Sequence, residues 1–185
     1  MAIEIHRLEA SRRDDFYRLH SDTHGCGWCF CAAWWTPTWD GWSDRSAEQN
    51  RALREGLFER GEYDGYLLYA EGEPAAWMQV GRRDRLPHLM SDYGLDPDPE
   101  TWAVTCFLVA PGFRRRGMSR RMLAAALDDL ERRGIRKVEA FPRRGDHLPP
   151  EDLWRGPEGL FLEAGFEIVR EDARRPILRR TAGPD

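Results

Sequence analysis

The sequence predicts a single α/β domain in which helices cover both faces of a mixed sheet. Short apolar runs typical of buried strands alternate along the chain with stretches whose apolar residues recur at helical spacing. In addition, 185 residues with 41% hydrophobic content suffice for one sizeable core, and no linker or internal repeat divides them. We therefore expect residues 1–185 to form one domain.

Two helices are predicted in the first half of the chain. One begins at Ser11, which is followed three residues later by Asp14 as a capping partner. The other covers residues 46–60, and its first residues Ser46 and Gln49 have the same spacing. A hydroxyl followed three residues later by a polar acceptor is typical of a capping box, so both positions indicate helix starts.

Three strands are also predicted in this half, at residues 3–8, 66–70 and 74–81. The second and third are separated by Glu-Gly-Glu at residues 71–73, which indicates a hairpin. Residues 82–100 contain three prolines and many charges. We expect this stretch to be a long surface loop that helps to shape a binding site.

The second half is predicted to contain one long helix, a short helix and the strands 102–109, 137–141, 166–170 and 177–181. The long helix begins near Gly117 and ends at Gly134. Its expected buried face consists of Met118, Met122, Leu123, Ala126, Leu127 and Leu130.

The junction at residues 109–119 joins the end of an apolar strand to the start of this helix. The backbone N–H groups of residues 116–120 have no earlier carbonyl to bond, and the helix dipole favours an anion at the same place. Gly117 has no side chain to keep a diphosphate at a distance, Ser119 can donate, and three arginines at residues 114–116 add positive charge. The junction therefore predicts a diphosphate site.

Other interpretations of the arginines are a solvated basic turn, a nucleic-acid surface or a nucleotide-triphosphate loop. The 28 Lys and Arg residues are outnumbered by 32 Asp and Glu residues, which argues against a nucleic-acid binder. No Gly-Lys-Ser/Thr follows a glycine loop, which argues against a nucleotide-triphosphate site.

At these residues the chain resembles the GNAT superfamily of acyl-CoA-dependent N-acetyltransferases. The family's cofactor motif, Gln/Arg-x-x-Gly-x-Gly/Ala, stands here as Arg114-x-x-Gly117-x-Ser119, with Ser as a departure in the last place. The resemblance is strongest over residues 62–180, where the order of strands and helices also matches, and it includes Ala164-Gly165-Phe166 at the start of a late strand.

The resemblance implies a central, mostly antiparallel sheet of six to seven strands, with helices on both faces and a splayed cleft at the fourth strand. It also implies an activity. The acceptor amine of a small molecule or peptide would attack the thioester of acetyl-CoA, the co-substrate, directly in a ternary complex, and no metal would be required. The alternatives are a non-catalytic acyl-CoA-binding sensor and a zinc-stabilised interaction module.

The same resemblance assigns residues to the donor site. The Val109 N–H would polarise the thioester carbonyl as an oxyanion donor. The expected cofactor-binding residues are Leu108, Val109, Arg114, Arg115, Arg116, Gly117, Met118, Ser119 and Arg120.

Two departures from the family leave the proton path open. Phe161 stands where many members have a tyrosine acid, and Ala103 stands where histone-modifying members have a glutamate base. A base is needed because an amine with a pKa of ~10.4 is mostly protonated at neutral pH. Glu100 is the candidate base, and further candidates in the expected loop are Asp84, His88, Asp92 and Tyr93. The alternative for each is a solvated surface group.

A segment rich in cysteine and tryptophan lies in the region that adjoins the acceptor site in GNAT proteins. His24, Cys26, Cys29 and Cys31 permit a zinc site, although their spacing is compressed and no second ligand pair follows. The other interpretation is that tryptophans of this segment wall the acceptor pocket or pack under the sheet.

The expected substrate pocket consists of Trp28, Trp77, Cys106 and Phe161. Cys106 could in principle accept an acyl group, but its place between apolar strand residues is more typical of a small buried side chain.

The remaining expectations concern the compartment and the partners. Cysteines gathered in one short segment suit a reducing compartment, and no stretch is long and apolar enough for a signal peptide or membrane span. We therefore expect a cytoplasmic protein that binds neither nucleic acid nor membranes. The sequence leaves open whether it acts alone or as a homodimer.

Overall fold

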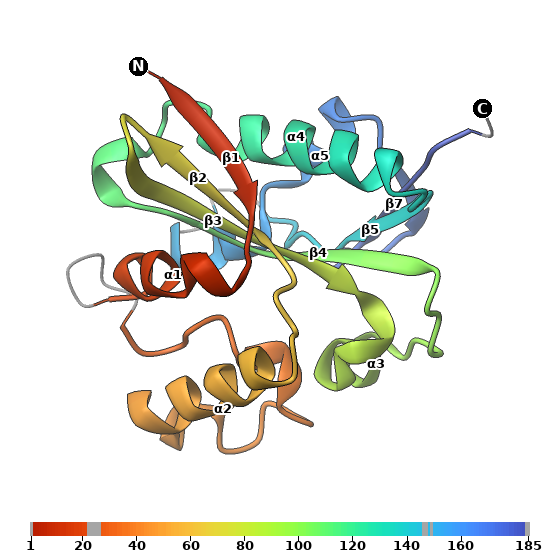
Figure 1. Ribbon diagram of the computed structural model, residues 1–185. Helices are drawn as coiled ribbons and strands as arrows, with labels where there is room; N and C mark the ends of the chain where they lie inside the picture. Colours follow the sequence, from red (N-terminus) through yellow and green to blue (C-terminus); the bar gives the residue numbers. More distant parts are fainter. Residues whose placement is uncertain (1, 22–26, 146–147, 149, 184–185) are drawn as a thin grey trace.

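The computed structural model describes residues 2–21, 27–145, 148 and 150–183, which form one sheet of seven strands flanked by helices (Figure 1). The strands are β1 Ile3–Arg7, β2 Tyr66–Ala70, β3 Glu73–Arg82, β4 Thr101–Val109, β5 Lys137–Ala140, β6 Glu167–Arg170 and β7 Ile177–Thr181. Their order across the sheet is β1-β2-β3-β4-β5-β7-β6. The pair β4 and β5 is parallel and the other neighbours are antiparallel, so the predicted mixed sheet is confirmed.

The helices form a layer on each face of this sheet. They are α1 Arg13–Leu19, α2 Ala47–Glu59, α3 Pro87–Tyr93, α4 Met118–Arg132 and α5 Glu158–Glu163. Single 3-10 turns are η1 Ala10–Arg12, η3 Ala33–Trp35, η4 Trp42–Asp44, η5 Arg83–Arg85 and η6 Pro111–Phe113, and η7 Pro150–Arg155 is longer. Figure 1 shows α4 and α5 over one face and α1, α2 and α3 over the other.

Helix α4 packs on the sheet through the face that the sequence predicts. Its six buried residues are the six predicted from helical spacing: Met118, Met122, Leu123, Ala126, Leu127 and Leu130. They join the larger core cluster together with residues of β2, β3 and β4. This burial fixes where the first turn of α4 lies relative to the end of β4.

Strand β4 leaves its parallel neighbour halfway along its length. Thr101–Val104 pair with Lys137–Ala140 of β5, and the rest of β4 pairs with β3 alone. The register with β3 also shifts here. Gln79 pairs with Cys106, whereas the next residue, Val80, pairs with Val104. Thr105 is therefore the extra residue of a β-bulge, which bends the strand at the point where β5 ends.

The two predicted capping boxes have different outcomes. At Ser46 the box is present, because Ser46 Oγ accepts from the Gln49 N–H (3.2 Å) and Gln49 Oε1 accepts from the Ser46 N–H (2.8 Å). The box at Ser11 is wrong. Ser11 lies in η1, its hydroxyl donates to Glu9 at 2.9 Å, and α1 begins two residues later at Arg13.

The predicted surface loop at residues 82–100 is also wrong in its first part. The structure has η5 and α3 there, and Leu86, Leu89 and Tyr93 are buried against the sheet. These apolar residues recur at helical spacing, Pro87 occupies the first turn, and Gly94 ends the helix with a φ of 57°. The sequence of this stretch therefore contains helix signals, although its charged residues and three prolines favour a loop.

No helix in the described residues is long and apolar enough to cross a membrane.

Candidate functional site

The second half of β4 directs its backbone groups alternately to β3 and away from it. The Ala110 N–H bonds to the Ala75 carbonyl of β3 at 2.9 Å. In an antiparallel pair, hydrogen-bonded and non-hydrogen-bonded positions alternate, so the backbone of Leu108 faces β3 and that of Val109 faces the edge that β5 has left. Val109 can thus donate its N–H to a ligand, whereas Leu108, which we expected to bind pantetheine, has its backbone groups committed to the sheet.

The same alternation identifies Phe107 as a residue that sequence reasoning missed. It lies two positions before Val109, so its backbone also faces the unpaired edge. The Val109 carbonyl on this edge accepts a hydrogen bond from Arg114 Nε at 3.0 Å. This bond holds the loop after β4 against the strand and brings the arginine cluster to its end.

The loop between β4 and α4 has the geometry of an anion cradle. Gly117 precedes the helix with a φ of 75°, and a Cβ placed there would meet nothing within 4 Å. The first helical bond joins the Arg121 N–H to the Gly117 carbonyl at 3.1 Å. The N–H groups of Met118, Ser119 and Arg120 therefore have no earlier helical carbonyl to bond and face the open space.

The side chains around this cradle differ in what they can contribute. Met118 is buried, so it offers only its backbone. Arg120 is paired with Glu163 of α5. Arg115 and Arg116 are exposed at the rim, and in the described part of the chain neither is paired with a carboxylate. Two positive charges and a helix start thus surround a space without side chains, which suits a diphosphate.

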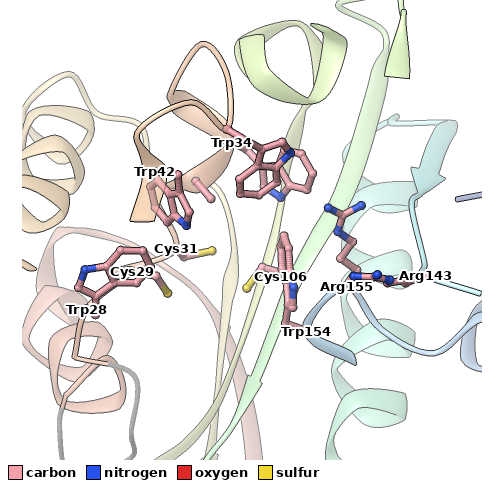
Figure 2. A pocket seen from close by; sticks show the side chains of 11 residues that line it. Trp28, Cys29, Cys31, Trp34, Trp42, Cys106, Arg143, Trp154 and Arg155 are labelled. Atoms are coloured by element: carbon pink, nitrogen blue, oxygen red, sulfur yellow. The ribbon is translucent and has the colours of Figure 1, made fainter. Parts of the chain in front are cut away.

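On the other face of β4, a cavity of about 480 Å³ opens beside Cys106 (Figure 2). Its lining comes from three separate parts of the chain, namely the segment between α1 and α2, the middle of β4, and the segment from β5 to η7. The lining residues are Trp28, Cys29, Cys31, Ala33, Trp34, Trp39, Trp42, Cys106, Arg143, Trp154 and Arg155. Such a volume is typical of a small-molecule site.

Two neighbouring thiols in the cavity wall, those of Cys31 and Cys106, have pKa values shifted in opposite directions. Figure 2 shows the sulfur atoms of Cys31 and Cys106 directed toward each other. Burial raises the pKa of Cys31, but contact with the Cys106 thiol and the buried Arg54 guanidinium outweighs it, so the net shift is downward. The same contact and burial raise the pKa of Cys106 well above its ordinary value. Cys106 is therefore a neutral thiol at neutral pH, a small side chain in the cavity wall.

The predicted pocket residues separate into two groups. Trp28 and Cys106 line the cavity. Trp77 and Phe161 are fully buried in different core clusters and do not reach it. Phe161 packs against Phe107 and Phe166, with ring centroids 6.1 and 5.4 Å apart, so it fills the core beneath the strand edge.

The candidate bases lie away from the reacting region. Glu100 precedes β4, and nine residues of strand place it about 30 Å from Val109. Asp84 pairs with Arg82, and Asp92 pairs with Arg175 at 2.8 Å. These contacts hold the carboxylates outside the cavity.

The two other candidates, His88 and Tyr93, are buried behind the cavity wall. His88 Nδ1 lies 2.9 Å from the Ala33 carbonyl, and its ring packs edge-on against Trp39 at 4.2 Å. The Tyr93 hydroxyl accepts from Arg155 at 2.9 Å. Both side chains support cavity residues rather than lining the cavity.

The zinc interpretation involves His24 and Cys26, which lie outside the described residues. Within the described ranges, no group of three or more His, Cys, Asp or Glu side chains has an arrangement that could hold a metal ion. Cys29 and Cys31 are among the cavity-lining residues.

The pocket predicted from the sequence does not include Trp39, Trp42, Trp154 or Arg155, which also line the cavity. Trp39 and Trp42 belong to the same tryptophan-rich stretch as Trp28, so their composition was a usable signal. Trp154 and Arg155 lie more than a hundred residues further along, and no local pattern marks them. Only the packing of η7 beside β4 brings them to the site.

Comparisons with known proteins concern the family and the fold of the chain. The profile of the Acetyltransferase (GNAT) family matches residues 13–148. Comparison with curated protein sequences gives no significant match. Among solved structures, the PaiA N-acetyltransferase from Thermoplasma acidophilum in complex with coenzyme A has a TM-score of 0.59 at 11% identity, covering 98% of this chain and 100% of that chain.

Two other structures have the same fold over nearly the whole chain. The ribosomal-protein-S18-alanine N-acetyltransferase from Escherichia coli has a TM-score of 0.55 at 17% identity, with coverage of 100% of this chain and 98% of that chain. An N-acetyltransferase from Staphylococcus aureus Mu50 has a TM-score of 0.57 at 10% identity, with coverage of 98% and 99%. At these identities the likeness concerns the fold.

Proposed function

Because the chain belongs to the GNAT family of acetyltransferases, and is thus an acyltransferase, we propose that it transfers an acetyl group from acetyl-CoA to an amine bound in the tryptophan-lined cavity. The observation that carries the proposal is the position of two sites on one strand. The anion cradle follows Val109, and the cavity opens beside Cys106. Three residues of strand separate these positions by about 10 Å.

The diphosphate of the donor would bind the N–H groups at the start of α4, with Arg115 and Arg116 at the rim. The pantetheine arm would then follow the β4 edge, where the backbone groups of Phe107 and Val109 are directed. An N–H of this edge, that of Val109 in the first instance, would stabilise the oxyanion as the amine attacks the thioester carbonyl. The adduct collapses to the amide as the C–S bond breaks, and the nitrogen releases its second proton. The departing CoA thiolate accepts a proton because the pKa of such a thiol is ~8.5.

The groups that line the cavity determine which of them could take the proton of the acceptor amine. None of its described lining residues is a carboxylate or a histidine. The Cys31 thiol, whose pKa is lowered, is buried and already donates to Gln79 Oε1 at 3.0 Å. The amine would therefore lose its proton to water in the cavity before attack. This route replaces the one through Glu100, which lies at the far end of the strand.

The test compares two glycines that share a backbone conformation. Gly117 and Gly134 have φ of 75° and 76°, and at each a Cβ would meet nothing within 4 Å. Glutamate at either position costs about 1 kcal/mol of stability because φ is positive. Only Gly117→Glu places a carboxylate where the diphosphate binds. We expect acetyl-CoA to raise the Tm of the natural protein and of Gly134→Glu, but not that of Gly117→Glu.

Thiol release from acetyl-CoA in the presence of an amine panel then separates the enzyme from a sensor. An enzyme gives amine-dependent release that Gly117→Glu abolishes. Stabilisation by acetyl-CoA without release for any amine would support the sensor instead. Equal stabilisation of both glycine variants would remove the cradle from the proposal.

A further inference from the structure

Five indole rings form a continuous aromatic wall in the cavity, and Figure 2 labels four of them. Successive ring centroids are 4.9 Å apart for Trp28 and Trp42, 6.2 Å for Trp42 and Trp39, 5.6 Å for Trp39 and Trp34, and 5.6 Å for Trp34 and Trp154. Trp28 and Trp39 remain 37% and 36% exposed. The contacts among Trp28, Trp42, Trp39 and Trp34 are edge-to-face, at 65–80°, so the rings enclose the cavity from several directions. The exposed parts of Trp28 and Trp39 offer apolar surface to an aromatic ligand.

Arg155 supplies positive charge beside this wall. Its guanidinium carbon lies 4.8 Å from the ring centroids of both Trp34 and Trp154, so two indole rings contact the group and restrict its position. One of its N–H groups donates to the Tyr93 hydroxyl at 2.9 Å. In the described part of the chain no carboxylate pairs with Arg155, so most of its five donors remain for a ligand. A planar guanidinium held in this way is suited to a carboxylate.

The other charged residue of the lining is also an arginine. Arg143 forms an ion pair with Asp152 at 2.8 Å, so its charge is partly compensated. None of the described lining residues is acidic. An acceptor with several positive charges, such as a polyamine or a lysine-rich peptide, would therefore meet repulsion from two arginines and find no counter-charge.

We infer that the acceptor carries an aromatic ring, an alkyl amine and a carboxylate. Arg155 binds the carboxylate while the tryptophan wall holds the ring. This inference rests on the proposed function and names its acceptor class. The amine would point toward Cys106, where the cavity meets the bulge of β4.

The first experiment measures binding in the presence of CoA, so it does not depend on turnover. Matched pairs differ only in the carboxylate, with L-phenylalanine against 2-phenylethylamine, and 4-(aminomethyl)benzoate against benzylamine. Binding is followed by quenching of the protein's tryptophan fluorescence. We expect the carboxylate member of at least one pair to bind about 10- to 100-fold more tightly, as for a hydrogen-bonded charge pair.

Three variants and one control assign this difference to Arg155. Arg155→Gln should abolish the preference within a pair, and Arg155→Lys should retain part of it, because the charge remains while the fork of donors is lost. Tyr93→Phe removes the hydroxyl that accepts a hydrogen bond from Arg155 and should keep the preference. Arg132→Gln, at an exposed site in the last turn of α4, is the control for a general loss of charge.

Equal binding within both pairs, tighter binding of the amines without a carboxylate, or no binding of any of the four compounds would overturn the inference. In each case a Tm shift with acetyl-CoA would still support the donor site of the proposed function. A preference for the carboxylate compound that Arg155→Gln leaves intact would also contradict the inference about the acceptor. So would an Arg155→Gln variant that loses activity equally with both members of a pair, because the arginine would then serve the donor.

Discussion

His20 shows how one buried residue links the fold to pH. Its ring stacks on Phe16 at 4.0 Å, and its Nδ1 lies 2.9 Å from the Phe16 carbonyl. Burial lowers the pKa of His20 to about 3, the hydrogen bond to Phe16 opposes this, and the Arg54 charge adds to the lowering. The residue is therefore neutral in the folded protein over most of the acid range.

This depressed pKa predicts a loss of stability in acid. In the unfolded chain His20 takes up a proton below about pH 6.5, whereas the folded protein resists protonation down to about pH 3. The stabilising contribution is complete above the unfolded pKa and is lost as the pH falls, by up to about 1.4 kcal/mol per pH unit. Urea unfolding at about pH 7, 6 and 5 should show this slope, and His20→Gln should reduce it.

A slope in the His20→Gln variant identical to that of the natural protein would show that other groups cause the acid sensitivity.

At the scale of elements, the start of α2 and the start of α1 contain the same sequence signal with different results. Ser46 and Gln49 form both hydrogen bonds of a capping box, and α2 begins at the next residue. The turn η1 precedes α1, and it draws the Ser11 hydroxyl to the side chain of Glu9. A neighbouring side chain thus competes with the helix end for the hydroxyl.

This contrast predicts that replacing each serine with alanine lowers the free energy of unfolding by different amounts. Ser46→Ala removes the acceptor for the Gln49 N–H and should lower the free energy of unfolding by about 1 kcal/mol. Ser11→Ala should change it by less than about 0.5 kcal/mol, because no helix cap is lost. Urea denaturation of both variants provides the measurement, and equal losses would argue against the capping role of Ser46.

At the scale of the whole molecule, α2 fixes one wall of the cavity through a buried arginine. Arg54 is fully buried and donates to the carbonyls of Phe30 and Cys31, the former at 3.0 Å. These two residues have φ of 42° and 51°, which non-glycine residues rarely adopt. The arginine therefore stabilises a strained turn that carries Cys31 into the cavity.

Arg54→Met should relax this turn and distort the proposed acceptor cavity while leaving the proposed donor site intact. We expect kcat/KM for the best acceptor to fall at least about tenfold, with about 1–3 kcal/mol of stability lost from the two carbonyls. The Tm shift with acetyl-CoA should persist, because the cradle lies at the start of α4 on the other face. Arg132→Met, at an exposed position in the last turn of α4, should preserve the acceptor kinetics. Parallel losses of acceptor activity and acetyl-CoA stabilisation would contradict this separation.

The sequence by itself determined the elements whose signals are local. The spacing of Met118 to Leu130 defined the buried face of α4, and Gly117 marked the start of this helix, because helix period and chain reversal are properties of a few adjacent residues. The arginines beside Gly117 predict an anion site there by their charge alone. The order of these elements also sufficed for the resemblance to the family.

The tertiary structure alone decided which groups meet at the site. Whether Leu108 or Phe107 presents its backbone to the unpaired edge depends on the register with β3, and one bulge reverses the direction of every residue beyond it. Trp154 and Arg155 join Trp28 in one cavity because η7 packs beside β4. Such contacts join residues far apart in the chain, and only the balance of burial across the whole core selects them.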